Sequence, residues 1–265
     1  MNKLEEIIAN TRKRVLSLKE KKTIHHFEES IYFNRNTISL KQRLKQSDES
    51  GIIAEFKRQS PSKGPINLNA SVVSTIEGYE KAGASAVSIL TEPVFFLGNN
   101  IDLTAARVFV NLPILRKDFI VDEIQILESK AIGADVILLI ASVLSKEEMQ
   151  HFTNVAHDLG LEVLVEIRDK EEIENIPTNA DVVGVNNRNL KTFSEGIEQS
   201  KLLSEFIPKD FLRISESAID NAETISELHK YGYRGFLTGE HFMRNEFPEK
   251  ACKQLVDELK SFTKR

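Results

Sequence analysis

Charged side chains end several of the short apolar segments in this 265-residue chain, and their types suit proton transfer. Glu55 and Lys57 end one such segment, Lys117 ends a second, and Glu166 ends a third. An ionised group in that position is costly to bury unless it faces a polar cavity. Because opposite charges in one cavity shift pKa values in both directions, such a cluster can supply an acid and a base at one pH. The residues therefore predict an active site built from strand ends.

Spacing along the strands indicates which of these side chains converge. Glu55 and Lys57 are two residues apart, and so are Asn186 and Arg188, so each pair shares one face of its strand. Glu216 ends a further strand. If one face of every strand looks into a barrel, these side chains meet above the packed core. A solvated charge or a structural salt bridge would explain any one of them, but it would not explain the whole set.

Two turns rich in small residues suggest a site for a phosphate group. They span residues 215–219 and 237–241, after the seventh and eighth expected strands, where barrels often bind phosphate. The helix that follows each turn would present free backbone N–H groups to an anion. Ser60 and Lys63, in the loop after the first strand, would complete the clamp. Each loop taken alone is equally consistent with ordinary turn chemistry.

Phenylalanines close to the polar set could form an apolar wall for a ring, although core packing is the simpler role for each. They are Phe95, Phe96 and Phe119. The six histidines show no ligand spacing, so no metal site is predicted.

The elements that must position these residues alternate regularly from Gly51 onward. Each unit is a strand, a loop, a helix and then a glycine before the next strand, as at Gly83, Gly133, Gly160 and Gly232. Strict alternation implies parallel strands. Eight units favour a closed (β/α)8 TIM barrel over an open doubly wound sheet, and no G-x-G-x-x-G follows the first strand. The expected strands lie near 52–57, 86–91, 113–118, 135–140, 162–167, 181–186, 211–216 and 235–239.

The N-terminal fifth of the chain has a different character. Residues 2–22 have an apolar stripe typical of an amphipathic helix, which could pack on the barrel or lean over its site. Residues 23–50 are polar, and we expect them to be irregular and without catalytic groups. The prediction is one domain over 1–265, with a helical extension over 1–50 and the barrel over 51–265.

Composition narrows the class of protein further. The formal net charge is -5 and the pI is about 5.8, which argues against a broad nucleic-acid-binding surface. One cysteine, Cys252, excludes an internal disulfide and fits a reducing cytosol. No signal peptide is visible, and the apolar stretch 136–144 is far shorter than the roughly 20 residues that span a bilayer. We expect a cytoplasmic protein without nucleic-acid or membrane partners, and the residues give no oligomeric state.

Six segments, in order and at strand ends, resemble the indole-3-glycerol phosphate synthase family of tryptophan biosynthesis. The resemblance covers nearly the whole chain. It rests on residues 54–64 (AEFKRQSPSKG), 90–93 (LTEP), 115–120 (LRKDFI), 165–166 (VE), 185–190 (VNNRNL) and 215–217 (SES).

The resemblance implies a reaction in which a phosphorylated ribulose bearing a 2-carboxyanilino group closes into an indole ring, losing carbon dioxide and water. It implies no cofactor and no metal. Lys117 looks like the general acid that protonates the ketose carbonyl. Lys57 looks like the cation that holds the anthranilate carboxylate, and service as a second acid is open to it as well. Glu166, with Glu55 beside it, looks like a general base or the acid for dehydration. A lysine proton donor would gain from a pKa below the usual value of about 10.4.

The other matched positions are substrate contacts, and two residues depart from the family pattern. Ala218 stands where glycine is usual, which costs energy if the backbone needs a positive φ. Glu240 is an acid beside the expected phosphate. The contacts implied are Asn186, Arg188 and Glu216 for the sugar hydroxyls and the lysines, Ser60, Ser217 and Gly239 for phosphate, and Phe96, Phe119 and Leu138 for the ring.

Three other functions compete with this interpretation. A phosphoribosylanthranilate isomerase is a similar phosphate-binding barrel whose chemistry resembles an Asp and Cys acid–base pair. Here the one cysteine, Cys252, lies too near the C-terminus to reach the end of the first strand. A Schiff-base aldolase could use Lys117, and borohydride trapping would reveal it. A non-catalytic phosphate-binding protein gives no reason for two lysines and two glutamates at converging strand ends.

Overall fold

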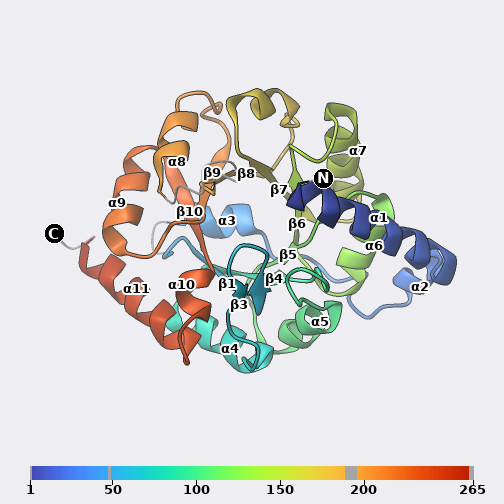
Figure 1. Cartoon of the computed structure of the whole chain (residues 1–265), viewed down its shortest axis with the longest axis horizontal. Helices are drawn as coiled ribbons and strands as arrows, with labels where there is room; N and C mark the ends of the chain where they lie inside the picture. The colour runs from blue at the N-terminus through green and yellow to red at the C-terminus, as the bar shows by residue number, and fades with distance from the viewer. Residues whose placement is uncertain (1, 47–48, 189–195, 263–265) are drawn as a thin grey trace.

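Eight parallel strands close into a barrel in the computed structural model, which describes residues 2–46, 49–188 and 196–262 (Figure 1). Neighbouring strands follow the order β1-β10-β9-β8-β7-β6-β5-β4 around the ring. The predicted TIM barrel is therefore confirmed, and the open sheet is excluded. The strands are β1 (Ile52–Phe56), β4 (Ala86–Leu90), β5 (Ile114–Lys117), β6 (Val136–Ile140), β7 (Glu162–Ile167), β8 (Val182–Asn186), β9 (Leu212–Glu216) and β10 (Tyr233–Thr238).

Helices surround the ring of strands (Figure 1). The four glycines at the predicted helix ends all have positive φ, from 71° to 96°. After β7 the chain forms a short 3-10 helix, η1 (Lys170–Asn175), instead of an α-helix. The α-helices of the barrel are α4 (Val72–Ala82), α5 (Asn100–Phe109), α6 (Glu123–Ala131), α7 (Lys146–Asp158), α8 (Glu198–Leu203), α9 (Ala222–Lys230), α10 (Glu240–Met243) and α11 (Pro248–Phe262).

Side-chain alternation along the strands produces two apolar layers. Ile53 and Leu115 belong to the layer inside the barrel, whereas Phe56 and Ile114 belong to the layer between strands and helices. The inner layer fills the barrel, so polar strand-end residues of the same parity stand directly above it. A small hairpin, β2 (Gln59–Ser60) with β3 (Gly64–Pro65), follows β1.

The N-terminal extension is more ordered than expected. Helix α1 (Lys3–Lys21) confirms the predicted amphipathic helix, but residues 23–50 also contain α2 (Ile24–Glu28) and α3 (Leu40–Lys45). The expectation of an irregular segment is wrong there because Leu40 and Leu44 are buried with the inner barrel layer. In the view of Figure 1, α3 is seen through the centre of the ring of strands. No helix in the described ranges is long and apolar enough to span a membrane.

Candidate active site

The carboxyl ends of the strands surround a pocket that contains most of the predicted site residues. Gly239 lines an adjoining pocket on the β10 side, which shares Glu55, Lys57, Arg188 and Ser217 with the first. Ser60 lines neither of the two pockets. The predicted residues along the first pocket are Glu55, Lys57, Phe96, Lys117, Phe119, Leu138, Glu166, Asn186, Arg188, Glu216 and Ser217.

Lys117 lies between two carboxylates in the centre of the pocket. Its Nζ is 2.5 Å from Glu216 Oε2 and 3.2 Å from Glu166 Oε2. All three side chains are largely buried, with 13% of Lys117 and 2% of each glutamate exposed. They come from β5, β9 and β7, so the barrel wall fixes their positions. We call Lys117, Glu166 and Glu216 the central cluster.

Charges in the central cluster shift its pKa values in different directions. Burial lowers the pKa of Lys117, but the adjacent carboxylates, Glu216 foremost, outweigh burial and raise it above its ordinary value. The expectation of a lowered lysine pKa is therefore wrong. Burial raises the pKa of Glu216 to about 7. Glu166 is also buried, yet Lys117 and Arg168 lower its pKa to about 2. Glu216 therefore holds a proton far more readily than Glu166 does.

A missing side chain makes room for Glu216. A Cβ atom at Gly184, on neighbouring β8, would lie 2.4 Å from Glu216 Oε1. That oxygen is buried and makes no hydrogen bond within the described structure. An unpartnered buried oxygen favours the protonated form of the carboxyl group, in agreement with its raised pKa.

Arg168 belongs to the site but was not predicted. Its Nη2 donates to Glu166 Oε1 at 2.9 Å, and its side chain lines the pocket. Arg168 is two residues beyond Glu166, the same spacing that links Glu55 with Lys57. That spacing was the signal that could have found it.

Lys57, at the end of β1, pairs with the carboxylate of Glu55. Its Nζ is 2.5 Å from Glu55 Oε1, and both side chains are nearly buried. Glu55 also fits against Gly239, where a Cβ atom would lie 2.4 Å from the carboxylate oxygen. The lack of a side chain at Gly239 therefore lets the end of β10 approach Glu55. This holds whether or not Gly239 also contacts an anion.

The segments that follow β1, β8, β9 and β10 form a second polar region, the rim. We define the rim as Ser62, Lys63, Arg188, Ser217 and Glu240. Arg188 donates to Ser62 Oγ at 2.9 Å and to Glu240 Oε2 at 3.2 Å. Lys63 Nζ lies 3.5 Å from Glu240 Oε1. Glu240 therefore points towards both cations of the rim. The motif that contains Arg188 ends at Asn189 and Leu190, which lie outside the described residues.

Asn186 connects the rim to the barrel. Its Oδ1 accepts hydrogen bonds from the backbone N–H of Arg188 at 3.0 Å and from Ser217 Oγ at 3.2 Å. Ser217 and Ala218 both have positive φ, 69° and 57°. The unusual alanine is thus in a conformation that favours glycine, as anticipated.

Ser60 is directed into its own hairpin. Its hydroxyl accepts from the backbone N–H of Lys63 at 3.2 Å and lies 3.3 Å from Ser62 Oγ. Ser62, two residues further on, lines the pocket in its place.

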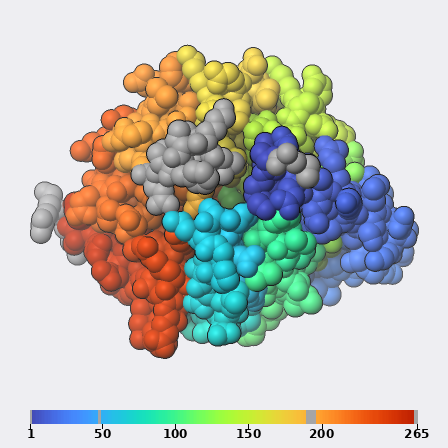
Figure 2. Space-filling model, viewed as in Figure 1, coloured from blue at the N-terminus to red at the C-terminus, as the bar shows by residue number. Residues whose placement is uncertain are grey.

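Apolar side chains form the remaining wall of the pocket. The rings of Phe96 and Phe119 lie 6.1 Å apart at 39°. The start of α1 contributes Leu4 and Ile7 to the same pocket, as the amphipathic pattern allowed. Figure 2 shows this dark-blue end of α1 beside the cyan segment that follows β1.

Within residues 2–46, 49–188 and 196–262, no group of three or more His, Cys, Asp and Glu side chains is arranged to hold a metal ion. The prediction of a metal-free and cofactor-free site stays a prediction.

A TIM barrel with a buried lysine–carboxylate cluster, an apolar wall and a cationic rim defines an enzyme of acid–base chemistry on a small anionic substrate. The family model described as indole-3-glycerol phosphate synthase matches residues 4–255. The chain belongs to this family, and the predicted class, a carbon–carbon lyase of tryptophan biosynthesis, is confirmed.

Individual relatives agree over nearly the full length. The chain is 45% identical to the indole-3-glycerol phosphate synthase of Bacteroides thetaiotaomicron, over 96% of this chain and 97% of that protein. It is 41% identical to that of Campylobacter fetus, over 96% and 99%. A solved chain of the tryptophan synthase complex from Pyrococcus furiosus has a TM-score of 0.59 at 16% identity, covering 80% of this chain and 98% of that one. That last likeness concerns the fold alone.

Proposed function

We propose that the chain converts 1-(2-carboxyphenylamino)-1-deoxyribulose 5-phosphate to indole-3-glycerol phosphate, with Lys117 as the general acid for ring closure. The observation that carries the proposal is the position of Lys117. Its ammonium lies between Glu166 and Glu216, deep in a pocket that has an apolar wall on one side and a cationic rim on the other. The substrate has a flat ring, a ketone and a phosphate, which match these three parts.

In the first step the ring carbon that bears the carboxylate attacks the ketose carbonyl. The C=O electron pair moves to oxygen, which takes a proton from the Lys117 ammonium. Negative charge on that oxygen exists only in the transition state, so a nearby ammonium lowers the barrier instead of merely strengthening binding. The raised pKa of Lys117 keeps it protonated before the reaction.

In the second step the carboxylate leaves as carbon dioxide, and its bonding pair restores the aromatic ring. Lys57 holds this carboxylate, and the strong pairing of Lys57 with Glu55 limits how firmly it does so. Phe96, Phe119 and Leu138 surround the ring and reduce its contact with water. A less hydrated carboxylate loses carbon dioxide more readily.

In the third step the new hydroxyl leaves as water. It needs a proton from an acid, and the carbon beside the nitrogen loses a proton to a base. Glu166, with Glu55 nearby, is proposed for this step as base or as acid. Glu216 orients Lys117 and, with Asn186, binds the sugar hydroxyls.

Phosphate binding is assigned to the rim and the turns beside it. Arg188 and Lys63 supply positive charge, and Ser217 and Gly239 lie at the wall of the adjoining pocket. Ser60 contributes by holding the hairpin turn that presents Lys63. Glu240 has to give up its ion pairs as the phosphate enters.

A cytoplasmic location is part of the proposal. Cys252, the sole cysteine, is buried as a free thiol, and burial raises its pKa to about 12. A buried thiol of this kind is unreactive and suits a reducing compartment.

The direct test is to supply the carboxyanilino substrate and to follow indole fluorescence in the presence of a chelator. We expect turnover, with one carbon dioxide released per indole formed. A folded protein that forms no indole would contradict the proposal. Borohydride added during turnover should leave Lys117 unmodified, because acid catalysis forms no imine; a trapped adduct would favour the Schiff-base alternative.

A further inference from the structure

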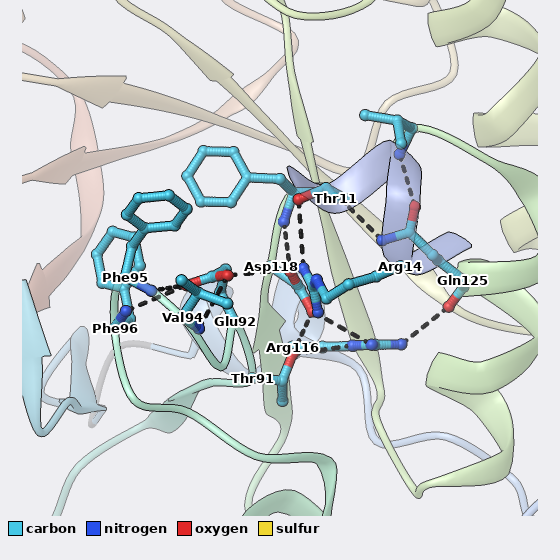
Figure 3. Close-up of polar contacts among 12 residues, drawn as sticks. Thr11, Arg14, Thr91, Glu92, Val94, Phe95, Phe96, Arg116, Asp118 and Gln125 are labelled. Atoms are coloured by element: carbon cyan, nitrogen blue, oxygen red, sulfur yellow. Dashed lines mark hydrogen bonds and ion pairs between the residues drawn. The ribbon is translucent and has the colours of Figure 1, made fainter. Parts of the chain in front are cut away.

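Two buried carboxylates behind the apolar wall accept hydrogen bonds from the backbone of Phe96 and Phe119, the two rings of that wall. Glu92 accepts hydrogen bonds from the backbone N–H groups of Val94, Phe95 and Phe96 at 3.1, 2.6 and 3.1 Å. Asp118 accepts from the N–H of Phe119 at 2.8 Å. Neither carboxylate side chain is exposed to solvent. The positions of the Phe96 and Phe119 rings therefore depend on these two anions. Figure 3 shows Glu92 beside Val94, Phe95 and Phe96, with Asp118 close by.

Arg14, on the N-terminal helix, lies beside both anions. A single nitrogen, Nη2, is 3.5 Å from Asp118 Oδ1 and 3.8 Å from Glu92 Oε1, and it donates to Thr11 Oγ1 at 3.2 Å. Figure 3 shows its guanidinium reaching from α1 to this point. Across the described ranges, Arg14 is the one cation within ion-pair distance of Glu92. Three backbone N–H groups satisfy the oxygens of Glu92, and Arg14 supplies the positive charge that offsets its buried negative charge.

Asp118 has additional partners that do not involve α1. Thr91 donates to its Oδ2 at 2.7 Å, and the buried Arg116 donates at 3.2 Å while also binding Glu128. These contacts belong to the barrel wall. Loss of Arg14 therefore leaves Asp118 compensated and the barrel intact, and it affects chiefly the loop held by Glu92.

We propose that Arg14 is a positioning residue for the aromatic group of the substrate. It joins the Glu92 loop and the Asp118 turn to one cation, and so fixes the gap between Phe96 and Phe119. Because it belongs to α1, it also holds Leu4 and Ile7 over the same pocket. The N-terminal extension thereby contributes to selecting a flat aryl group. The inference rests on the proposed ring pocket.

The test compares Arg14→Ala with Lys19→Ala. Lys19 is on the same helix and forms a similar ion pair with the β5–α6 loop, 2.6 Å from Asp122, but it does not touch Glu92 or Asp118. We expect Arg14→Ala to raise KM about fivefold, the effect of losing one hydrogen bond, with kcat little changed. Lys19→Ala should alter neither value. Equal KM values for the two variants would overturn the proposal.

A double-mutant cycle with Phe96→Ala separates positioning from general loss of stability. If Arg14 acts through the ring wall, Arg14→Ala should raise KM much less in the Phe96→Ala background than in the native chain. Arg14→Lys should raise KM less than Arg14→Ala does, because lysine keeps the positive charge but lacks the planar guanidinium with its several donors. Independent effects of the two changes would refute the inference for Arg14. A Phe96→Ala variant with native KM would instead refute the ring pocket itself.

Discussion

The central cluster and the rim are both polar, yet they are built differently. The cluster stands on strands, and 13% or less of each of its side chains is exposed. The rim stands on loops and on the first residue of α10, and 27% of both Arg188 and Glu240 is exposed. Buried charges are screened little, whereas partly exposed charges are screened more and can exchange partners with a ligand. The cluster is thus suited to chemistry and the rim to reversible binding.

Lys117→Ala should have the largest effect and should act on kcat. Removing the proton donor is expected to lower kcat by about 10² or more. Circular dichroism and the melting temperature will show whether the barrel survives with Glu166 and Glu216 unpaired. A folded Lys117→Ala enzyme with native kcat would remove the distinction between the two regions.

Glu216→Gln should change how stability depends on pH. The pKa of Glu216 is raised to about 7 when folded, so the folded state binds this proton more tightly than the unfolded state. Its contribution is full below the ordinary pKa of 4.5 and is lost as pH rises to about 7. We expect the native protein to lose about 3 kcal/mol over this range relative to the variant, measured by denaturant unfolding.

Glu166→Gln provides the matched control for that measurement. Because Glu166 is one of the charges that raise the pKa of Glu216, its removal should shift the loss of stability to lower pH. An unchanged pH profile in both variants would mean that the central cluster does not titrate as a unit.

Arg188→Ala should act on the rim and therefore on KM. Loss of a charge-assisted hydrogen bond to phosphate is expected to raise KM about tenfold, with the fold intact. The rise should shrink at high salt, since the region is solvated. A variant that fails to fold would show that Arg188 serves structure more than binding.

Ala218→Gly should give the smallest effect and a gain. At φ 57° alanine is strained, so glycine should stabilise the chain by about 1 kcal/mol. Ala251→Gly, inside α11, is the control and should destabilise it by a similar amount. The sign of the two changes in melting temperature is the measurement, and equal signs would contradict the strain at Ala218.

Much of the barrel could be predicted because its signals are local. Apolar segments ending in Lys57 or Glu166 indicate both where a strand lies and which of its side chains point into the barrel. This is because successive side chains of a strand point to opposite faces. The helices α2 and α3 could not be found in this way. They have five and six residues, and helices so short depend on tertiary packing such as that of Leu40.

Most of the predicted residues line one pocket, but their electrostatics could not be predicted, and their roles stay predictions. The pKa of Lys117 follows from the number of carboxylates that reach it, and that number is set by β7 and β9 together. The partners of Arg14 were out of reach for the same reason, because Asp118 is 104 residues away in the chain. Contacts over such separations leave no local pattern in a single sequence.

Adjacent residues of β5 illustrate what the pleat demands of folding. Arg116 points outward to Glu128 on α6, while Lys117 points inward to Glu216. A slip of β5 by one position would exchange these two cations. Arg116 would enter the pocket without its buried partners, and Lys117 would be enclosed beside α6. Such a misaligned barrel would carry uncompensated charge on both faces of one strand. The alternation that places Lys117 in the active site therefore also disfavours a barrel assembled in the wrong register.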